Sequence, residues 1–191
     1  KGVLGEGATL SPLVARWPGG KIKVHGMTDD MTTYLDLMPT FLQVAGVVYP
    51  ARWHGDTPLR PLGGRNLLPL FQGESLSPPE NFYWNLDGHF ALLDRGRWKL
   101  SSVYNEENER NNAEPVLKLY DLMSDPAETT NLAGKQNAMA SMLLDNYRNW
   151  ADEHGAVPRY QVLDTYKSLR VAHSQAMKHH LESIRKERSA S

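Results

Sequence analysis

Two glycine-containing turns, eight residues apart, constrain the fold of this chain more than any other sequence feature. Asp87-Gly88 and Arg95-Gly96 each follow a short run that is rich in aromatic and aliphatic residues. Glycine supplies the positive φ that a tight hairpin turn requires. We therefore expect the runs before, between and after the two turns to be antiparallel strands, at residues 81–86, 89–94 and 98–104.

A fourth apolar run at 116–122 completes a predicted four-stranded antiparallel sheet. The polar gap that precedes it, 105–115, is expected to be a mobile loop. The segments Trp98-Lys-Leu100 and Leu119-Tyr-Asp-Leu122 are predicted to lie in neighbouring strands on either side of that loop.

Apolar residues at helical spacing predict a helix at 135–154, which Gly155 ends. Its predicted apolar stripe consists of Met139, Met142, Leu143, Asn146, Tyr147 and Trp150. A last helix is predicted at 164–186.

The first 80 residues are more irregular. We predict a short buried strand at 12–17, because apolar residues there are followed by Pro18-Gly19-Gly20. Asp36 is a candidate N-cap for a helix that Gly46 ends. Residues 49–80 are rich in proline and glycine and predict a long irregular connection, with a short turn at 66–71.

Composition excludes several function classes. Lys and Arg total 21 against 22 Asp and Glu, so the chain lacks the basic surplus that nucleic-acid binding requires. It contains no cysteine, which excludes a disulfide, a thiolate metal site or a cysteine nucleophile within it. No apolar run is long enough to span a membrane. The lack of cysteine fits both the cytoplasm and a bacterial periplasm.

Three segments, in order along the chain, resemble the sulfatase family of the alkaline phosphatase superfamily. The first runs from Lys1-Gly through Glu6-Gly to Trp17-Pro-Gly, although Ala8 stands where the family commonly has a second glycine. The second is Tyr34-Leu-Asp-Leu-Met-Pro-Thr, continuing to Gly46. The third is Trp98-Lys-Leu, followed by Leu119-Tyr-Asp-Leu-Met-Ser-Asp-Pro-Ala-Glu-Thr-Thr-Asn-Leu-Ala133.

The resemblance implies an α/β, alkaline phosphatase-like fold, of which this chain is the C-terminal part. Residues 1–80 are expected to be the last strand and helix of the large α/β catalytic domain, followed by the irregular connection. Residues 81–163 are expected to be a small subdomain, a four-stranded antiparallel sheet with a packed helix. Residues 164–191 are expected to be a helical extension.

The resemblance also implies hydrolysis of a sulfate ester by a formylglycine nucleophile and a Ca²⁺ ion. Formylglycine is made from the first residue of a Cys/Ser-x-Pro-x-Arg motif, which does not occur here. We therefore expect the nucleophile and the calcium ligands to lie outside this chain, in the N-terminal part of the same enzyme. The chain alone is expected to be inactive. A periplasmic or secreted location is favoured by the resemblance.

Lys1 is the one position that matches a catalytic residue of the family, the lysine that contacts the sulfate. A compact ammonium can stabilise charge that develops on the sulfuryl oxygens. The alternative is a frayed terminal lysine in solvent. Glu6 is either a ligand for backbone amides of this loop or an ordinary surface acid. His54 is a candidate substrate-binding residue at a pocket rim, or else an ordinary loop histidine.

Two other functions remain open from the sequence. One is a phosphonate or phosphate monoester hydrolase of the same superfamily, and the other is a non-catalytic, sulfatase-like interaction module. The nucleophile motif and the metal ligands would distinguish the three functions.

Overall fold

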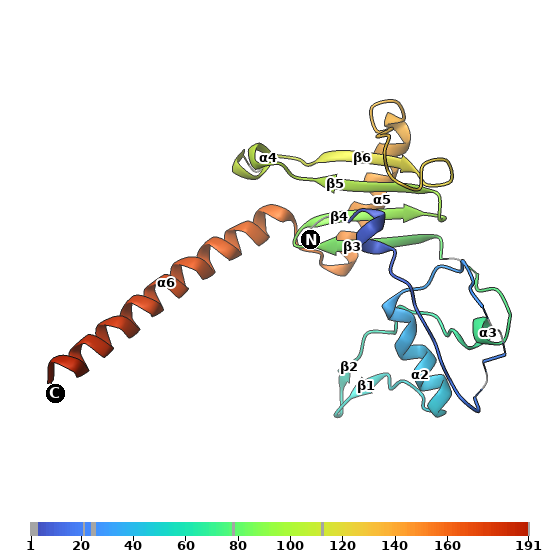
Figure 1. Ribbon diagram of the computed structural model, residues 1–191, viewed down its shortest axis with the longest axis horizontal. Helices are drawn as coiled ribbons and strands as arrows, with labels where there is room; N and C mark the ends of the chain where they lie inside the picture. Colours follow the sequence, from blue (N-terminus) through green and yellow to red (C-terminus); the bar gives the residue numbers. More distant parts are fainter. Residues whose placement is uncertain (1–3, 21, 24–25, 78, 112, 191) are drawn as a thin grey trace. The chain divides into compact units, whose positions relative to one another are not determined.

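The computed structural model describes residues 4–20, 22–23, 26–77, 79–111 and 113–190, with side chains as far as residue 178. Contacts divide the chain into two units, which are both drawn in Figure 1. The sheet unit combines the N-terminal residues up to Ser11 with the chain from Asn81 onward, and the loop unit is Pro12–Glu80. Each is described by itself below.

The sheet unit contains the predicted four-stranded antiparallel sheet, whose strands follow one another in chain order. They are β3 (Asn81–Leu86), β4 (His89–Asp94), β5 (Trp98–Val103) and β6 (Val116–Asp121). The prediction that β5 and β6 are neighbours is confirmed, because Leu100 lies opposite Leu119 and Lys99 lies opposite Tyr120.

Both predicted hairpin turns are also confirmed. Asp87 and Gly88 have φ values of 52° and 80°, and Arg95 and Gly96 have values of 46° and 72°. Positive φ at both central residues is the geometry that follows the right-handed twist of paired strands.

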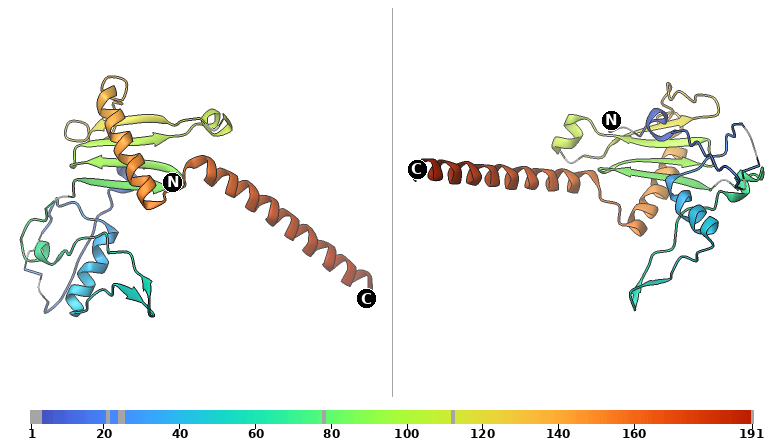
Figure 2. Two further views of the ribbon diagram at one scale, coloured as in Figure 1. Left: turned by 180° about the vertical axis from the view of Figure 1, so that it is seen from behind. Right: turned by 60° about the horizontal axis from the view of Figure 1, so that its bottom comes forward.

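Helix α5 (Asn137–His154) packs on one face of the sheet, as Figure 2 shows from behind. Its buried residues Ala140, Leu143 and Tyr147 form a core with sheet residues that alternate along the strands: Phe90, Leu92, Leu100 and Leu119. Gly155 ends the helix with φ 67°. The prediction that Met142 belongs to this apolar stripe is wrong, since the residue is 47% exposed.

The predicted mobile loop at 105–115 contains a short helix, α4 (Glu106–Asn111), so that prediction is wrong. Asn105 and Asn108 cap it reciprocally, because each side-chain oxygen accepts from the other residue's amide N–H. Acidic residues in its first turn favour the positive end of the helix dipole.

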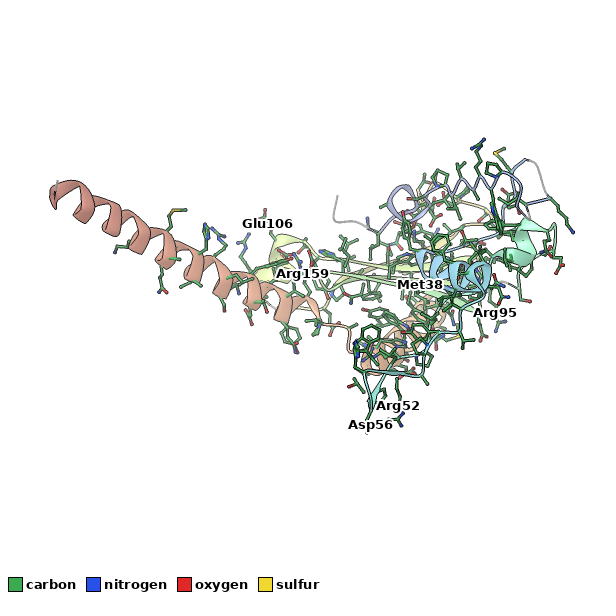
Figure 3. The ribbon with its side chains drawn as sticks, turned by 90° about the horizontal axis from the view of Figure 1, so that it is seen from below. Met38, Arg52, Asp56, Arg95, Glu106 and Arg159 are labelled. Carbon is green, nitrogen blue, oxygen red and sulfur yellow. The ribbon has the colours of Figure 1, made fainter. Side chains whose placement is uncertain are left out.

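The last helix, α6 (Arg159–Ala190), begins five residues earlier than predicted, directly after Pro158. Every residue from Asp164 to Lys178 is exposed, and the side chains in Figure 3 project from all sides of this helix. Among the described residues, no helix has both the length and the apolar character needed to cross a membrane.

The loop unit has little regular structure. It contains a 3-10 turn, η1 (Tyr34–Asp36), and helix α2 (Leu37–Ala45). A two-stranded hairpin follows, β1 (Arg52–Trp53) with β2 (Thr57–Pro58), and then the short helix α3 (Leu68–Phe71) within the predicted 66–71 turn.

The predicted buried strand at 12–17 is not formed. Among the described residues no strand pairs with this segment, and Val14 is 89% exposed. An extended segment without a partner satisfies its backbone groups with water instead of a ladder.

Asp36 was predicted to cap α2, but its carboxylate serves the preceding turn and a distant loop. Oδ2 accepts from the amide of Thr33 at 2.9 Å, and Oδ1 accepts from the amide of Arg65 at 2.6 Å. The reason is that Asp36 already has helical backbone angles and is 2% exposed, so its side chain turns away from the first amides of α2. The C-cap prediction is confirmed, with Gly46 at φ 67°.

Candidate functional site: a buried lysine that holds the N-terminal segment

Lys1 and the next two residues lie outside the described residues, and the description of this segment begins at Leu4. Residues 6–9 form helix α1 (Glu6–Thr9), which lies on the sheet face opposite α5 in both Figures 1 and 2. This places the first of the three sequence segments discussed above directly against part of the third.

The contact is built around Lys99 in β5, whose side chain is fully buried. Its Nζ donates to Glu6 Oε1 at 2.6 Å and to Thr9 Oγ1 at 3.1 Å. It also lies 3.0 Å from Glu128 Oε1 and 5.9 Å from the centre of the Trp84 ring. Two of the three N–H groups of the ammonium thus have hydrogen-bond acceptors, and the Glu128 carboxylate adds an ionic contact.

Glu128 approaches the same segment from the loop after β6. Its Oε2 accepts from the amide of Glu6 at 2.8 Å. A Cβ added at Gly5 would lie 2.8 Å from that oxygen, so glycine permits the close approach. Glu128 Oε1 has no hydrogen-bond partner among the described residues, and the ionic contact with Lys99 is therefore its main compensation.

Asp125 holds the loop that carries Glu128. One carboxylate oxygen accepts from the amide and hydroxyl of Thr129, and the other accepts from the amide of Thr130 at 2.8 Å. These backbone bonds lower the pKa of Asp125 below its usual value. Glu128 itself has φ 55°, a left-handed conformation that is uncommon for a residue with a side chain. The hydrogen bonds of Asp125 thus hold the 125–130 loop in the conformation that places the Glu128 carboxylate.

We call Glu6, Thr9, Lys99 and Glu128 the lysine cluster. It holds two carboxylates against one ammonium, and both glutamates are largely buried. Losing one member of a buried ion pair typically costs about 3–5 kcal/mol, because a charge is left uncompensated. Neither alternative considered for Glu6 is correct. Among the described residues its carboxylate accepts from Lys99 and from the Thr9 hydroxyl, and from no backbone amide of the loop, and it is not a surface acid.

The described residues contain no group of three or more His, Cys, Asp or Glu side chains arranged to hold a metal ion. The carboxylates of the lysine cluster are engaged by Lys99 and by backbone amides, so they do not fit a Ca²⁺ site. The cluster can position a segment, and it has no free nucleophile or base.

A second ion pair in the sheet unit joins Arg97 to Asp121. Arg97 donates from Nε and Nη2 to the two carboxylate oxygens, at 3.1 and 2.8 Å. The guanidinium lowers the pKa of Asp121, and Asp121 raises that of Arg97. This pair lies at the ends of β5 and β6 and makes no contact with α1 among those described, which makes it a useful control for the lysine cluster.

His54, the candidate substrate-binding residue, lies in the turn between β1 and β2. The residue is exposed, has φ 37°, and packs edge-on against Trp53 with ring centres 4.5 Å apart. Arg52 and Asp56 close the same turn through a 2.9 Å bond from Nη1 to the Asp56 carbonyl, and both are labelled in Figure 3. His54 belongs to the loop unit, and the lysine cluster belongs to the sheet unit.

A hollow of about 260 Å³ lies in the sheet unit, between α4, α5 and the start of α6. Arg159, one of several charged residues that line this hollow, donates to Glu109 Oε1 at 2.6 Å and to the Asp87 carbonyl at 3.0 Å. Burial and the nearby Arg159 lower the pKa of His89 at its edge. Arg159 and Glu109 are thus paired with each other, and the hollow assigns no ligand.

The comparison with protein families decides the identity of the chain. Residues 1–152 match the model of the family described as "N-sulphoglucosamine sulphohydrolase, C-terminal". This chain belongs to the sulfatase family. The match covers the predicted Lys-Gly segment, the sheet and all but the last two residues of α5, and it ends before α6.

Named sulfatases are similar over most of the chain. Human arylsulfatase A is 30% identical over 154 residues, which cover 70% of this chain and 28% of the relative. An uncharacterized sulfatase from Schizosaccharomyces pombe is 28% identical, covering 82% and 27%. The ulvan-active sulfatase of Formosa agariphila is 25% identical, covering 76% and 34%. The chain spans about a third or less of the length of these relatives.

Among solved structures, a phosphonate monoester hydrolase from Agrobacterium radiobacter aligns with 68% of this chain and 26% of its own. The TM-score is 0.43 and the sequence identity is 20%.

Sequence reasoning missed Lys99 and Glu128 as members of a site. One signal was available, because Lys99 stands between two apolar residues in a strand that begins a recognised motif. A lysine at such a position needs a partner carboxylate. The choice among 22 acidic residues, however, depends on the fold.

Proposed function

We propose that this chain is the C-terminal part of a sulfatase that hydrolyses a sulfate monoester. The observation that carries the proposal is the family match over residues 1–152. The contacts that hold α1 on the sheet support it, because α1 belongs to the segment that resembles the family's catalytic loop.

In this proposal Lys1 contacts the sulfate group. A preorganised ammonium in a water-poor site stabilises the charge on the sulfuryl oxygens and on the leaving oxygen of the transition state. The chain's own contribution to the chemistry is thus one cation and the loop that presents it.

The formylglycine nucleophile and the Ca²⁺ ligands lie outside this chain in the proposal, in the N-terminal part of the same enzyme. The isolated chain is then inactive. Residues 1–80 complete the catalytic domain, 81–163 form the subdomain, and 164–191 extend it. We place the enzyme in the periplasm or outside the cell, following the family resemblance.

The loop unit fits a role as the end of a larger domain. Helix α2 exposes apolar residues, among them Met38 (labelled in Figure 3) at 53%, Phe41 at 62% and Val44 at 44%. We propose that these residues pack against the rest of the α/β domain, and that His54 lies at the rim of its substrate pocket.

Hydrolysis rates of two chromogenic substrates test this function. The full-length enzyme should release 4-nitrophenol from 4-nitrophenyl sulfate much faster than from 4-nitrophenyl phenylphosphonate. The isolated chain, as control, should show no turnover of either above buffer. A preference for the phosphonate ester would support the phosphonate hydrolase alternative, and no turnover by the full-length enzyme would support a non-catalytic module.

A further inference from the structure

We propose that Lys99, together with Glu6 and Glu128, is a positioning residue that sets the location of Lys1 in the active site. This inference rests on the proposed function, since it assigns the lysine cluster a role in the rate of sulfate ester hydrolysis and not only in stability.

The argument begins with distance along the chain. Lys1 precedes Glu6 by five residues, and five residues span at most about 18 Å when fully extended. Glu6 is fixed at two points, through its carboxylate to Lys99 and through its amide to Glu128. The lysine cluster therefore holds the described end of the segment that carries Lys1.

These contacts fix the orientation of α1 as well as its position. Apolar contacts between α1 and the sheet could also bury the segment, and replacing a buried ion network by apolar residues is often neutral or stabilising. Lys99 instead meets Glu6 and Thr9, one turn apart on α1, while Glu128 binds the amide that begins the helix. Three contacts of this kind determine the rotation of α1 about its axis.

These contacts also require an unfavourable backbone conformation at one residue. Glu128 adopts a left-handed backbone conformation with φ 55°, whereas Gly5 has ordinary extended backbone angles. Strained backbone of this kind is typically retained where it positions functional groups. The left-handed conformation of Glu128 therefore supports a positioning role for the carboxylate that binds the Glu6 amide.

A double-mutant cycle in the full-length enzyme tests the inference. The variants are Lys1→Ala, Lys99→Met and the two combined, with kcat/KM for 4-nitrophenyl sulfate as the readout. We expect Lys99→Met to lower the rate by about 10-fold to 100-fold, as a misplaced catalytic group does. In the Lys1→Ala background the same change should cost less than about threefold, because Lys99 acts through Lys1.

A charge-neutral variant separates positioning from stability. Lys99→Met combined with Glu6→Gln and Glu128→Gln leaves no unpaired charge, so we expect it to recover most of the melting temperature that Lys99→Met loses. The rate should stay low, because the neutral side chains do not reproduce the fixed contacts. A rate that recovers together with the melting temperature would overturn the inference.

Arg97→Gln is the matched control, since it breaks another ion pair of the same sheet away from α1 and should leave the rate unchanged. If Lys99→Met does not fold, the same cycle with the milder Glu6→Gln decides. Two outcomes would contradict the positioning role and leave the role proposed for Lys1 intact. One is that the rate losses of Lys99→Met and Lys1→Ala multiply fully in the double variant, and the other is a Lys99→Met rate within threefold of wild type. A Lys1→Ala enzyme with normal activity contradicts both this inference and the role proposed for Lys1.

Discussion

The sheet unit and the loop unit differ in how they bury their apolar residues. In the sheet unit, Leu92, Leu100, Leu119 and Leu143 are all fully buried, and they contact one another across the sheet and α5. In the loop unit Leu67 is fully buried, whereas Met38, Phe41 and Val44 of α2 are exposed.

This difference indicates that the two units depend to different degrees on the rest of a sulfatase for burial of their apolar residues. The sheet unit supplies both layers of its own core, a sheet and a helix, which is the minimum arrangement for a stable domain. Among the described residues, the loop unit has only the 3-10 turn η1, α2, the short helix α3 and a two-stranded hairpin, and the exposed apolar side chains of α2 are not covered within it. We infer that the sheet unit folds by itself and that the loop unit depends on sequence elsewhere in the enzyme.

The largest predicted effect comes from truncating one apolar residue in each unit, one buried and one exposed. Leu143→Ala should destabilise the isolated chain by about 3 kcal/mol or more, because it leaves a cavity between α5 and the sheet. Phe41→Ala should change stability by less than about 0.5 kcal/mol in the same chain, as expected for an exposed residue. Urea denaturation followed by tryptophan fluorescence measures both.

The comparison becomes sharper in the full-length enzyme. There Phe41→Ala should cost about 3 kcal/mol, because we expect the α/β domain to cover this side chain. An equally small effect in both contexts would contradict the proposed packing of α2.

A smaller effect is predicted for two glycines with similar backbone angles. Gly88→Ala in the sheet unit should cost more than Gly46→Ala in the loop unit. Both have positive φ, which costs a residue with a side chain about 1–2 kcal/mol. Only at Gly88 would the new Cβ also meet backbone, 2.3 Å from the Cα of Arg159. Equal losses on thermal melting would show that α6 does not pack on this turn.

The smallest predicted effect concerns acid stability. Arg97 lowers the pKa of Asp121 below the usual 3.8, so the folded state binds a proton less readily than the unfolded state. The stabilisation is thus complete above about pH 4 and is lost as the pH falls through the lowered pKa. In Arg97→Gln, the free energy of unfolding should therefore fall less steeply as the pH drops below 4.

Arg52→Gln, which breaks the exposed pair with Asp56 in the loop unit, is the control for this measurement. Unfolding midpoints recorded from pH 6 to pH 2 should respond to the first change and not to the second. An identical pH profile for Arg97→Gln and wild type would remove Asp121 as a source of acid sensitivity.

The sequence predicted the sheet unit well because its signals are local. Hairpin turns need glycine at fixed positions, and helix α5 has a regular apolar stripe. The predictions that are wrong depended on neighbours. Residues 12–17 have strand-like composition but no partner strand, and Asp36 has a capping side chain that Arg65 and Thr33 recruit instead.

The candidate site shows the same limit. Glu6 was identified from the first segment, but its partner Lys99 lies 93 residues further along the chain and Glu128 lies 122 residues away. No local pattern encodes such a pairing. The short helix α4 was missed for another reason, because its reciprocal Asn105–Asn108 cap resembles the composition of a loop.

The most direct test of the account is the activity of the Lys1→Ala variant of the full-length enzyme. We predict that kcat/KM for 4-nitrophenyl sulfate falls about 100-fold or more with an unchanged thermal melt, since one preorganised charge contact to the transition state is lost. Lys1→Arg should recover little, because a planar guanidinium does not fit the place of a compact ammonium. Lys135→Ala, at an exposed residue of the sheet unit, should keep the wild-type rate. A Lys1→Ala rate within threefold of wild type would contradict the claim that this chain contributes to the active site.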